Sequence, residues 1–216
     1  MAILFRDRDD AGRQLAERLG AGSEAGRGIV LGIPRGGVSV AFPVARKLQA
    51  PMDVFLAQKL GVPGQEELAF GAVSLGGEPF LDEQVIRAAR ISEEQISRIV
   101  AKAVATLERR AELYRGERAA IEVAGKSVVL VDDGIATGAS MFSAIRALRA
   151  MGPARLVVAV PVAPPSTCRW LRGELDELVC LHVPEEFYAV GQFYGDFGAV
   201  GDEEVTSLLR RAEAER

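Results

Sequence analysis

Short apolar runs alternate along the chain with stretches in which apolar residues recur every three or four positions. Apolar runs bounded by Gly, Pro or Asp are typical of buried strands, and the periodic stretches between them are typical of helices. The predicted strands span residues 28–33, 52–60, 70–75, 127–133, 155–162 and 177–183. The predicted helices span residues 38–49, 92–115, 140–151, 166–174 and 202–214, with Asp202 as the N-cap of the last. This alternation predicts an α/β fold, a Rossmann-like parallel sheet flanked by helices.

The most strongly periodic helix, residues 92–115, interrupts the series of strands. Ser92 and Gln95 have the spacing of a capping box at its start. We expect a single domain over residues 1–216 that carries a helical insertion at about 82–118. Three roles are open for this helix: a hood over a site, the contact of a homodimer, or a cover for the sheet.

The composition excludes several classes of protein. With 49% hydrophobic and 26% charged residues among 216, the chain has enough apolar material for a folded core. The net charge of −4, without a long run of one sign, argues against a nucleic-acid-binding surface. The longest apolar stretch, residues 156–165, is about half as long as a membrane-spanning helix. Charges from Arg6 onward interrupt what would be the apolar core of an export signal, so we expect a cytoplasmic protein.

One segment, residues 128–140 with the sequence VVLVDDGIATGAS, combines several features of a phosphate and sugar site. A predicted strand ends in Asp132 and Asp133, and a loop of small residues then opens a helix. The glycines of this loop expose backbone N–H groups, its Thr and Ser add hydroxyl donors, and the helix N-terminus attracts an anion. Ionised carboxylates suit sugar hydroxyls or magnesium and repel a bare phosphate. The segment favours phosphate plus ribose, and an ordinary turn with acidic helix caps is the structural alternative.

Other phosphate-related motifs do not account for this segment. The chain has neither a G-x-x-x-x-G-K-[ST] motif nor a G-x-G-x-x-G motif. A phospho-receiver domain needs a functional lysine after its acids, and the last lysine here is Lys126. The segment instead resembles the phosphoribosyl pyrophosphate (PRPP) signature of type I phosphoribosyltransferases, in which an apolar run meets two acids and a T-G turn.

This resemblance implies a type I phosphoribosyltransferase fold with a helical or loop hood, and a site for PRPP. Asp132 and Asp133 would hold the 2′- and 3′-hydroxyls of the ribose. The residues that would hold the 5-phosphate are Gly134, Ile135, Ala136, Thr137, Gly138, Ala139 and Ser140. Mg²⁺ is the implied cofactor, with Asp132, Asp133 and Asp196 as its candidate ligands.

A second motif, Pro34-Arg35-Gly36-Gly37, follows the first predicted strand, where this family places its pyrophosphate loop. Glycines there expose N–H groups to an anion, and Arg35 supplies a fixed positive charge. Both loops leave carboxyl ends of parallel strands, the edge at which α/β proteins bind ligands. By the same resemblance, Lys59 would reach the pyrophosphate. Taken separately, the motif also fits an ordinary turn, and Lys59 fits a solvent-exposed lysine.

A third stretch, residues 187–197 with the sequence FYAVGQFYGDF, resembles the F-V-V-G-Y-x-x-D-Y sequence that closes the base site of purine phosphoribosyltransferases. Phe187 would stack on the acceptor, and Asp196 would approach magnesium-bound pyrophosphate. This chain has one more residue between Gly191 and Asp196 than the family pattern. The structural alternative is an aromatic cluster in the core, which would contain Tyr188, Phe193 and Tyr194.

Two departures from the family pattern concern the acceptor. Members that act on 6-oxopurines have an acid at the position of Ala136. They also have a lysine that recognises the oxygen of the base. Alanine does not titrate, and residues 157–164 contain no lysine, so an adenine-like acceptor is favoured. Over most of its length the chain is more similar to uncharacterised bacterial phosphoribosyltransferase-like proteins. No catalytic side chain is assigned, and Glu66 and Glu67 are candidate bases.

The expected function is magnesium-dependent transfer of the 5-phosphoribosyl group from PRPP to a nitrogen acceptor, with release of pyrophosphate. The alternative is a non-catalytic sensor of PRPP or nucleotides on the same fold. In either case the expected partners are small molecules, and neither nucleic acid nor a membrane is expected.

Overall fold

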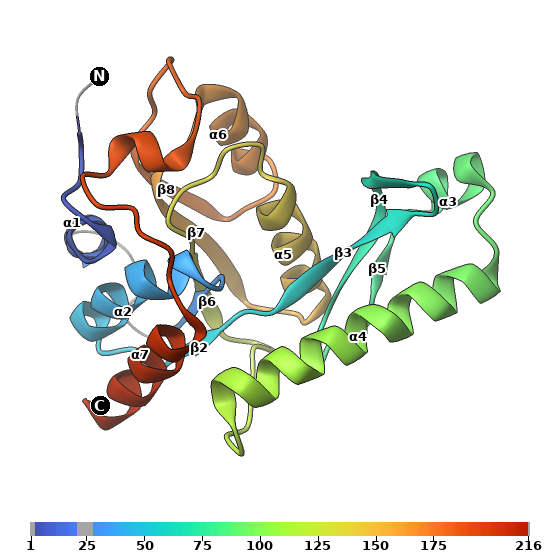
Figure 1. Ribbon diagram of the computed structural model, residues 1–216, viewed down its shortest axis with the longest axis horizontal. Coiled ribbons are helices and arrows are strands. Elements are labelled where there is room, and N and C mark those ends of the chain that lie inside the picture. The colour runs from blue at the N-terminus through green and yellow to red at the C-terminus, as the bar shows by residue number, and fades with distance from the viewer. Residues whose placement is uncertain (1–2, 21–27, 216) are drawn as a thin grey trace.

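The computed structural model describes residues 3–20 and 28–215, apart from the side chains of Glu67 and Ala139. Its centre is a sheet of five parallel strands in the order β2-β1-β6-β7-β8 (Figure 1). These strands are β1 (Ile29–Gly32), β2 (Met52–Val54), β6 (Ser127–Val131), β7 (Arg155–Val162) and β8 (Glu177–His182). The predicted α/β fold with a Rossmann-like parallel sheet is confirmed.

Helices cover both faces of this main sheet. They are α1 (Arg8–Gly20), α2 (Gly36–Leu48) and α7 (Asp202–Ala214) on one face, and α5 (Ala139–Ala150) and α6 (Pro165–Arg172) on the other (Figure 1). Side chains of β6 alternate between the two faces of the sheet. Val129 and Val131 pack on the face covered by α1, α2 and α7, and Val128 and Leu130 pack on the face covered by α5 and α6. All four are buried, which is why the strand reads as a continuous apolar run.

The expected strand at 52–60 is in fact two strands that belong to different sheets. After β2 the chain passes Phe55, whose N–H still donates to Gly32 O at 2.9 Å, and it then leaves the main sheet. It continues in a separate antiparallel sheet of β3 (Ala57–Val62), β4 (Gln65–Ser74) and β5 (Phe80–Leu81). The expected strand at 70–75 is therefore not part of the parallel sheet. Only two residues connect β3 to β4, and so short a connection permits antiparallel pairing alone.

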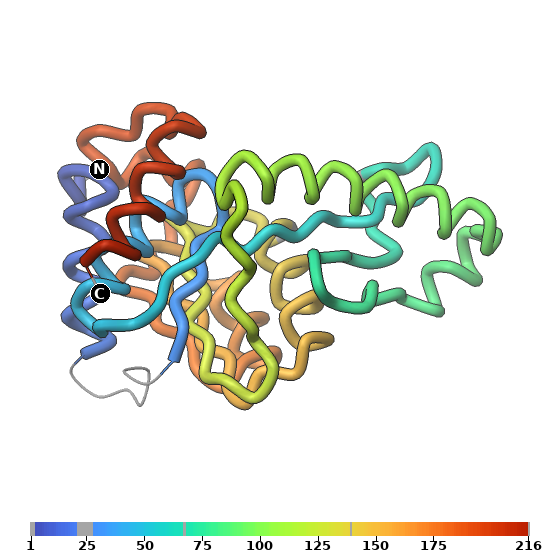
Figure 2. Tube along the Cα trace, turned by 90° about the horizontal axis from the view of Figure 1, so that it is seen from below, coloured from blue at the N-terminus to red at the C-terminus, as the bar shows by residue number. Residues whose placement is uncertain are grey.

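The antiparallel sheet, α3 (Glu83–Ala89) and α4 (Glu93–Arg115) project together from the main sheet (Figures 1 and 2). This projecting unit, residues 57–115, is here named the hood. The capping box of α4 is confirmed: Gln95 N donates to Ser92 Oγ at 3.2 Å, and Ser92 N donates to Gln95 Oε1 at 2.9 Å. The apolar side of α4 packs on the antiparallel sheet through buried Ala103 and Leu107. Because β3 to β5 also lie between β2 and β6, we propose that the insertion begins with β3.

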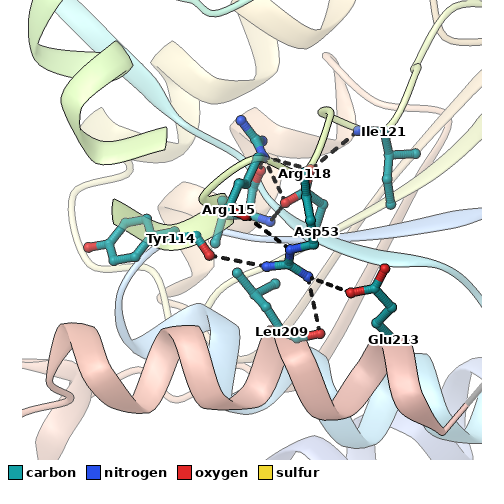
Figure 3. A network of polar contacts seen from close by, with 8 residues as sticks. Asp53, Tyr114, Arg115, Arg118, Ile121, Leu209 and Glu213 are labelled. Atoms are coloured by element: carbon teal, nitrogen blue, oxygen red, sulfur yellow. Dashed lines mark hydrogen bonds and ion pairs between the residues drawn. The ribbon is translucent and has the colours of Figure 1, made fainter. Parts of the chain in front are cut away.

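A buried ion pair ties the end of the hood to the main sheet (Figure 3). Arg115 Nε donates to both carboxylate oxygens of Asp53 at 2.9 Å, and Arg115 Nη2 donates to Val54 O at 2.8 Å. Arg118 extends the contact to α7 through Leu209 O and Glu213. The last turn of α4 is thus fixed to β2 and α7.

A second contact between α4 and α7 corrects the expected cap. Gly201 is the N-cap of α7, and Asp202 is its first residue. The Asp202 carboxylate instead accepts the hydroxyl of Tyr114 at 2.6 Å. Burial and this hydrogen bond raise the pKa of Tyr114 to about 12, so its hydroxyl is a donor at neutral pH.

The N-terminal arm, residues 3–7, lies beside β8 and pairs with residues 193–196. Leu4 N and Phe5 N both donate to Phe193 O, and Gly195 N donates to Phe5 O. Phe193 belongs to a short 3-10 helix, η2 (Val190–Phe193).

Among the helices of the described residues, none combines the length and apolar character that crossing a bilayer requires.

Candidate active site

Two of the predicted loops lie side by side because β1 and β6 are parallel neighbours. Gly32 is opposite Val131 at their carboxyl ends, and Ile33 N donates to Val131 O at 2.9 Å. The residues Pro34–Gly37, here named the glycine loop, therefore face the acid pair, Asp132 and Asp133. A Cβ on Gly37 would stand 2.9 Å from Asp132 Oδ1, and one on Gly36 would overlap the Asp133 carboxylate. Only glycine permits so close an approach.

The acid pair is partly buried and hydrogen-bonded within the protein. Asp133 N donates to Asp132 Oδ1 at 2.9 Å, and Arg8 Nε donates to Asp133 Oδ2 at 2.8 Å. Burial, followed by the charge of Asp133, raises the pKa of Asp132 well above its usual range. Burial also raises the pKa of Asp133, although the Arg8 guanidinium opposes the shift. A ligand hydroxyl that donates to these carboxylates, or a bound cation, would favour their ionised form over the protonated form.

The phosphate loop, residues 134–140, has the backbone that its glycines predict. Gly134 has φ +154°, and a Cβ there would meet Val190 Cγ1 at 2.5 Å. Gly138 has φ +81° and is the N-cap of α5, so it contributes no side chain to the helix N-terminus. The N–H groups of that first turn are therefore available to an anion.

The other members of the phosphate loop have different positions. Ala136, Thr137 and Ser140 are exposed, so both hydroxyls are accessible from outside. Ile135 is buried in the core, and its N–H donates to Val162 O at 3.0 Å, so it fixes the loop to the end of β7. The side chain of Ala139 lies outside the described residues.

The two cations assigned to pyrophosphate lie in different elements. Arg35 is the N-cap of α2, and its side chain is half-exposed. Its Nη1 lies 3.9 Å from Asp202 Oδ1. The peptide bond between Pro34 and Arg35 is cis. Lys59 is partly buried and is the third residue of β3, the strand with which the chain enters the hood.

The closing segment, residues 187–197, borders the phosphate loop through Val190 at Gly134. Phe187 is partly buried and packs on Phe193, with ring centroids 5.2 Å apart. Phe193 and Tyr194 are buried, as the core alternative predicts, whereas Tyr188 is 77% exposed. Phe187 thus lies in the segment that approaches the loop, and its contact with an acceptor remains a proposal.

Asp196 is not brought together with the acid pair. Its N–H donates to Arg6 O at 2.8 Å, and its Oδ1 accepts Gly198 N at 3.0 Å. Within residues 3–20 and 28–215, no three or more Asp, Glu, His or Cys side chains gather to hold a metal ion. The expected set of three carboxylates is therefore not assembled, because the N-terminal arm fixes the backbone of Asp196.

Of the two candidate bases, only Glu66 has a side chain that the structure describes. Glu66 is exposed beside the turn between β3 and β4, which lies at the end of the hood away from the main sheet (Figures 1 and 2). The side chain of Glu67 lies outside the described residues.

Arg8, by contrast, contacts Asp133 and was not singled out by the sequence. It stands in a charged run, RDRDD, that has no motif pointing to a partner 125 positions away.

A glycine loop, an acid pair and a helix N-terminus at one edge of a parallel sheet are typical of α/β proteins that bind phosphorylated ligands. The comparison with known families identifies which of these proteins the chain resembles. The family model described as "Phosphoribosyl transferase domain" matches residues 8–191. The chain belongs to this family.

Individual relatives agree with that assignment. A protein of Mycobacterium tuberculosis (strain H37Rv), named "Putative phosphoribosyl transferase Rv0571c", is 47% identical over 209 residues. The match covers 97% of this chain and 47% of that protein, so the chain spans about half the length of the curated relatives it matches. The crystal structure of TT1426 from Thermus thermophilus is 47% identical with a TM-score of 0.87, and the match covers 98% of this chain and 99% of that one.

Proposed function

We propose that this protein transfers the 5-phosphoribosyl group from PRPP to a nitrogen acceptor and releases pyrophosphate. The observation that carries the proposal is the direct packing of Gly36 and Gly37 against Asp132 and Asp133. This packing supports the proposal, because a loop suited to pyrophosphate then lies beside carboxylates suited to a ribose. The phosphate loop then provides a third, separate position for the 5-phosphate.

Each group has a role in the proposed reaction. The bond between C1 of the ribose and the pyrophosphate oxygen breaks, and its electron pair leaves with the pyrophosphate. The acceptor nitrogen bonds to C1 and loses its proton to the released pyrophosphate or to water. Asp132 and Asp133 hold the ribose hydroxyls, while Arg35, Lys59 and the glycine-loop amides stabilise the leaving anion. No nucleophilic side chain is required.

Magnesium fits the donor set of the proposed site, although the protein supplies few of its ligands. The acid pair offers hard carboxylate oxygens, and remaining positions would be filled by PRPP oxygens and water, as is usual for this ion. When bound, magnesium neutralises charge on the pyrophosphate.

The proposed acceptor is adenine-like rather than a 6-oxopurine. The small, exposed side chain of Ala136 stands on the phosphate loop where an acid would be needed to accept a proton from a 6-oxopurine. Phe187 is the proposed stacking partner of the acceptor. A homodimer and a cytoplasmic location remain proposals that accompany this function.

A thermal-shift experiment with PRPP and magnesium tests the donor site. At 100 times its dissociation constant, a ligand stabilises the native state by roughly 2.7 kcal/mol. We expect a magnesium-dependent shift in the wild type, its loss in the double variant Asp132→Asn/Asp133→Asn, and its retention in Glu94→Gln, an exposed acid of α4. No shift in the wild type would overturn the proposal.

Pyrophosphate release then separates catalysis from sensing. We expect release with adenine and little with hypoxanthine or guanine, measured by a coupled phosphate assay. Binding of PRPP without release for any nitrogen acceptor would favour the non-catalytic sensor instead.

A further inference from the structure

Arg8 is held by three independent contacts at the edge of the site. Its Nε donates to Asp133 Oδ2 at 2.8 Å, and its Nη1 donates to Gly198 O at 2.8 Å. Its guanidinium carbon lies 3.8 Å from the centroid of the Phe197 ring. The side chain is only 13% exposed. These contacts use the planar fork and the face of the guanidinium, which a lysine cannot reproduce.

The same contacts restrict the orientation of Asp133. One carboxylate oxygen is committed to Arg8, while the backbone carbonyl of Asp133 accepts the hydroxyl of Tyr194 at 2.6 Å. Among the described residues, no other residue donates a hydrogen bond to Oδ1 of Asp133, so this oxygen can accept one from a ligand hydroxyl. A Cβ on Gly36 would also stand 3.0 Å from Arg8 Nε. The Arg8–Asp133 pair thus forms the surface against which the glycine loop packs.

We infer that Arg8 is a positioning residue that orients the Asp133 carboxylate toward a hydroxyl of the bound ribose. The inference rests on the proposed function, because it requires a ribose at the acid pair. It differs from a purely structural role, in which Arg8 would only attach α1 to the closing segment. A structural role affects every ligand of the site alike, whereas positioning of Asp133 affects only ligands with ribose hydroxyls.

Two ligands separate these roles: ribose 5-phosphate and its 2,3-dideoxy analogue. Both present the same phosphate to the phosphate loop, and only the first presents hydroxyls to the acid pair. Binding is followed by the fluorescence of Trp170, the only tryptophan of the sequence. A Cβ on Gly138 would lie 4.0 Å from its ring, so the indole reports on that loop. Variants are Arg8→Met, Arg8→Lys and Asp133→Asn, with Arg13→Met as a matched control on α1, where Arg13 is exposed and pairs with Asp9.

We expect the wild type to prefer ribose 5-phosphate by at least about tenfold, since one hydrogen bond to a charged group has that effect on Kd. Arg8→Met and Asp133→Asn should each lose most of this preference while binding the dideoxy analogue as the wild type does. Arg8→Lys should recover part of the preference, and Arg13→Met should retain all of it.

Two results would overturn the inference, and they have different meanings. If Arg8→Met and Arg8→Lys bind both ligands more weakly but keep the wild-type preference, Arg8 has only a structural role and the proposed function stands. If the wild type shows no preference for ribose 5-phosphate, or binds neither ligand, the acid pair does not hold a ribose. The proposed function then fails together with the inference.

Discussion

At the scale of single residues, the acid pair places a charge where the surrounding protein disfavours it. Asp132 loses solvent on folding and stands beside a second carboxylate, and both effects raise its pKa. Functional sites commonly retain such destabilising groups because a ligand needs them. The stability of the ligand-free protein should therefore improve when this charge is removed without loss of the hydrogen bond to Asp133 N.

The variant Asp132→Asn makes that change, since the amide Oδ1 still accepts Asp133 N. A raised pKa means that the folded state binds a proton more tightly than the unfolded state, so wild-type stability falls as pH rises through the shifted pKa. We expect the variant to be more stable than the wild type by about 1 kcal/mol at pH 8, with the difference shrinking toward pH 4. Urea unfolding without magnesium or phosphate measures it. A wild type as stable as the variant at pH 8 would contradict the expectation.

At the scale of elements, a buried ion pair at the end of α4 connects the hood to the main sheet. The side chains of Arg115 and Asp53 are 11% and 8% exposed, and Ile121 N also donates to Asp53 Oδ2 at 3.3 Å. A buried carboxylate that loses its cation retains the full penalty of desolvation. The pair therefore matters more for attachment of the hood than the exposed ion pairs on its surface.

Arg115→Met should lower the free energy of unfolding by about 3 kcal/mol, because it leaves the buried Asp53 carboxylate without its cation. Arg87→Met is the matched control, as Arg87 pairs with Glu83 and both side chains are about 70% exposed. Its expected effect is below about 0.5 kcal/mol. Denaturant unfolding of both variants makes the comparison, and equal effects would show that the Asp53 contact is not energetically special.

At the scale of the whole molecule, the N-terminal arm packs against the closing segment next to the site. Phe5 is 1% exposed and packs on the rings of Tyr194 and His182, with centroids 5.2 and 5.5 Å apart. Arg8 follows three residues later and reaches Asp133. The arm thus joins the closing segment to the acid pair, and its packing supports both.

Phe5→Ala should destabilise the protein by about 3 kcal/mol, the usual effect of removing a buried aromatic ring. Ile3→Ala removes an apolar side chain from the same arm where it is 64% exposed, and its effect should stay within about 0.5 kcal/mol. Thermal and urea unfolding would measure both. A small effect of Phe5→Ala would mean that the arm does not contribute to the core.

Much of the fold was predictable because its signals are local. The strand at 155–162 and the helix at 202–214 have the bounds that their patterns predict, and the capping box of Ser92 and Gln95 is formed. Periodicity and capping depend on residues within a few positions of one another. The same holds for the glycine loop and the phosphate loop, whose glycines adopt the positions that the motifs indicate.

The sequence by itself therefore determined the parallel sheet, the flanking helices α2, α5, α6 and α7, and the two loops at the carboxyl edge, whereas α1 was not predicted. Only the tertiary structure decided that residues 52–60 divide between two sheets, that Asp196 is tied to Arg6, and that Arg8 pairs with Asp133. The physical reason is the range of the interactions. A strand, a cap or a tight turn is encoded in one short stretch, whereas the partner of a strand or a charge is chosen by packing between residues far apart in the chain.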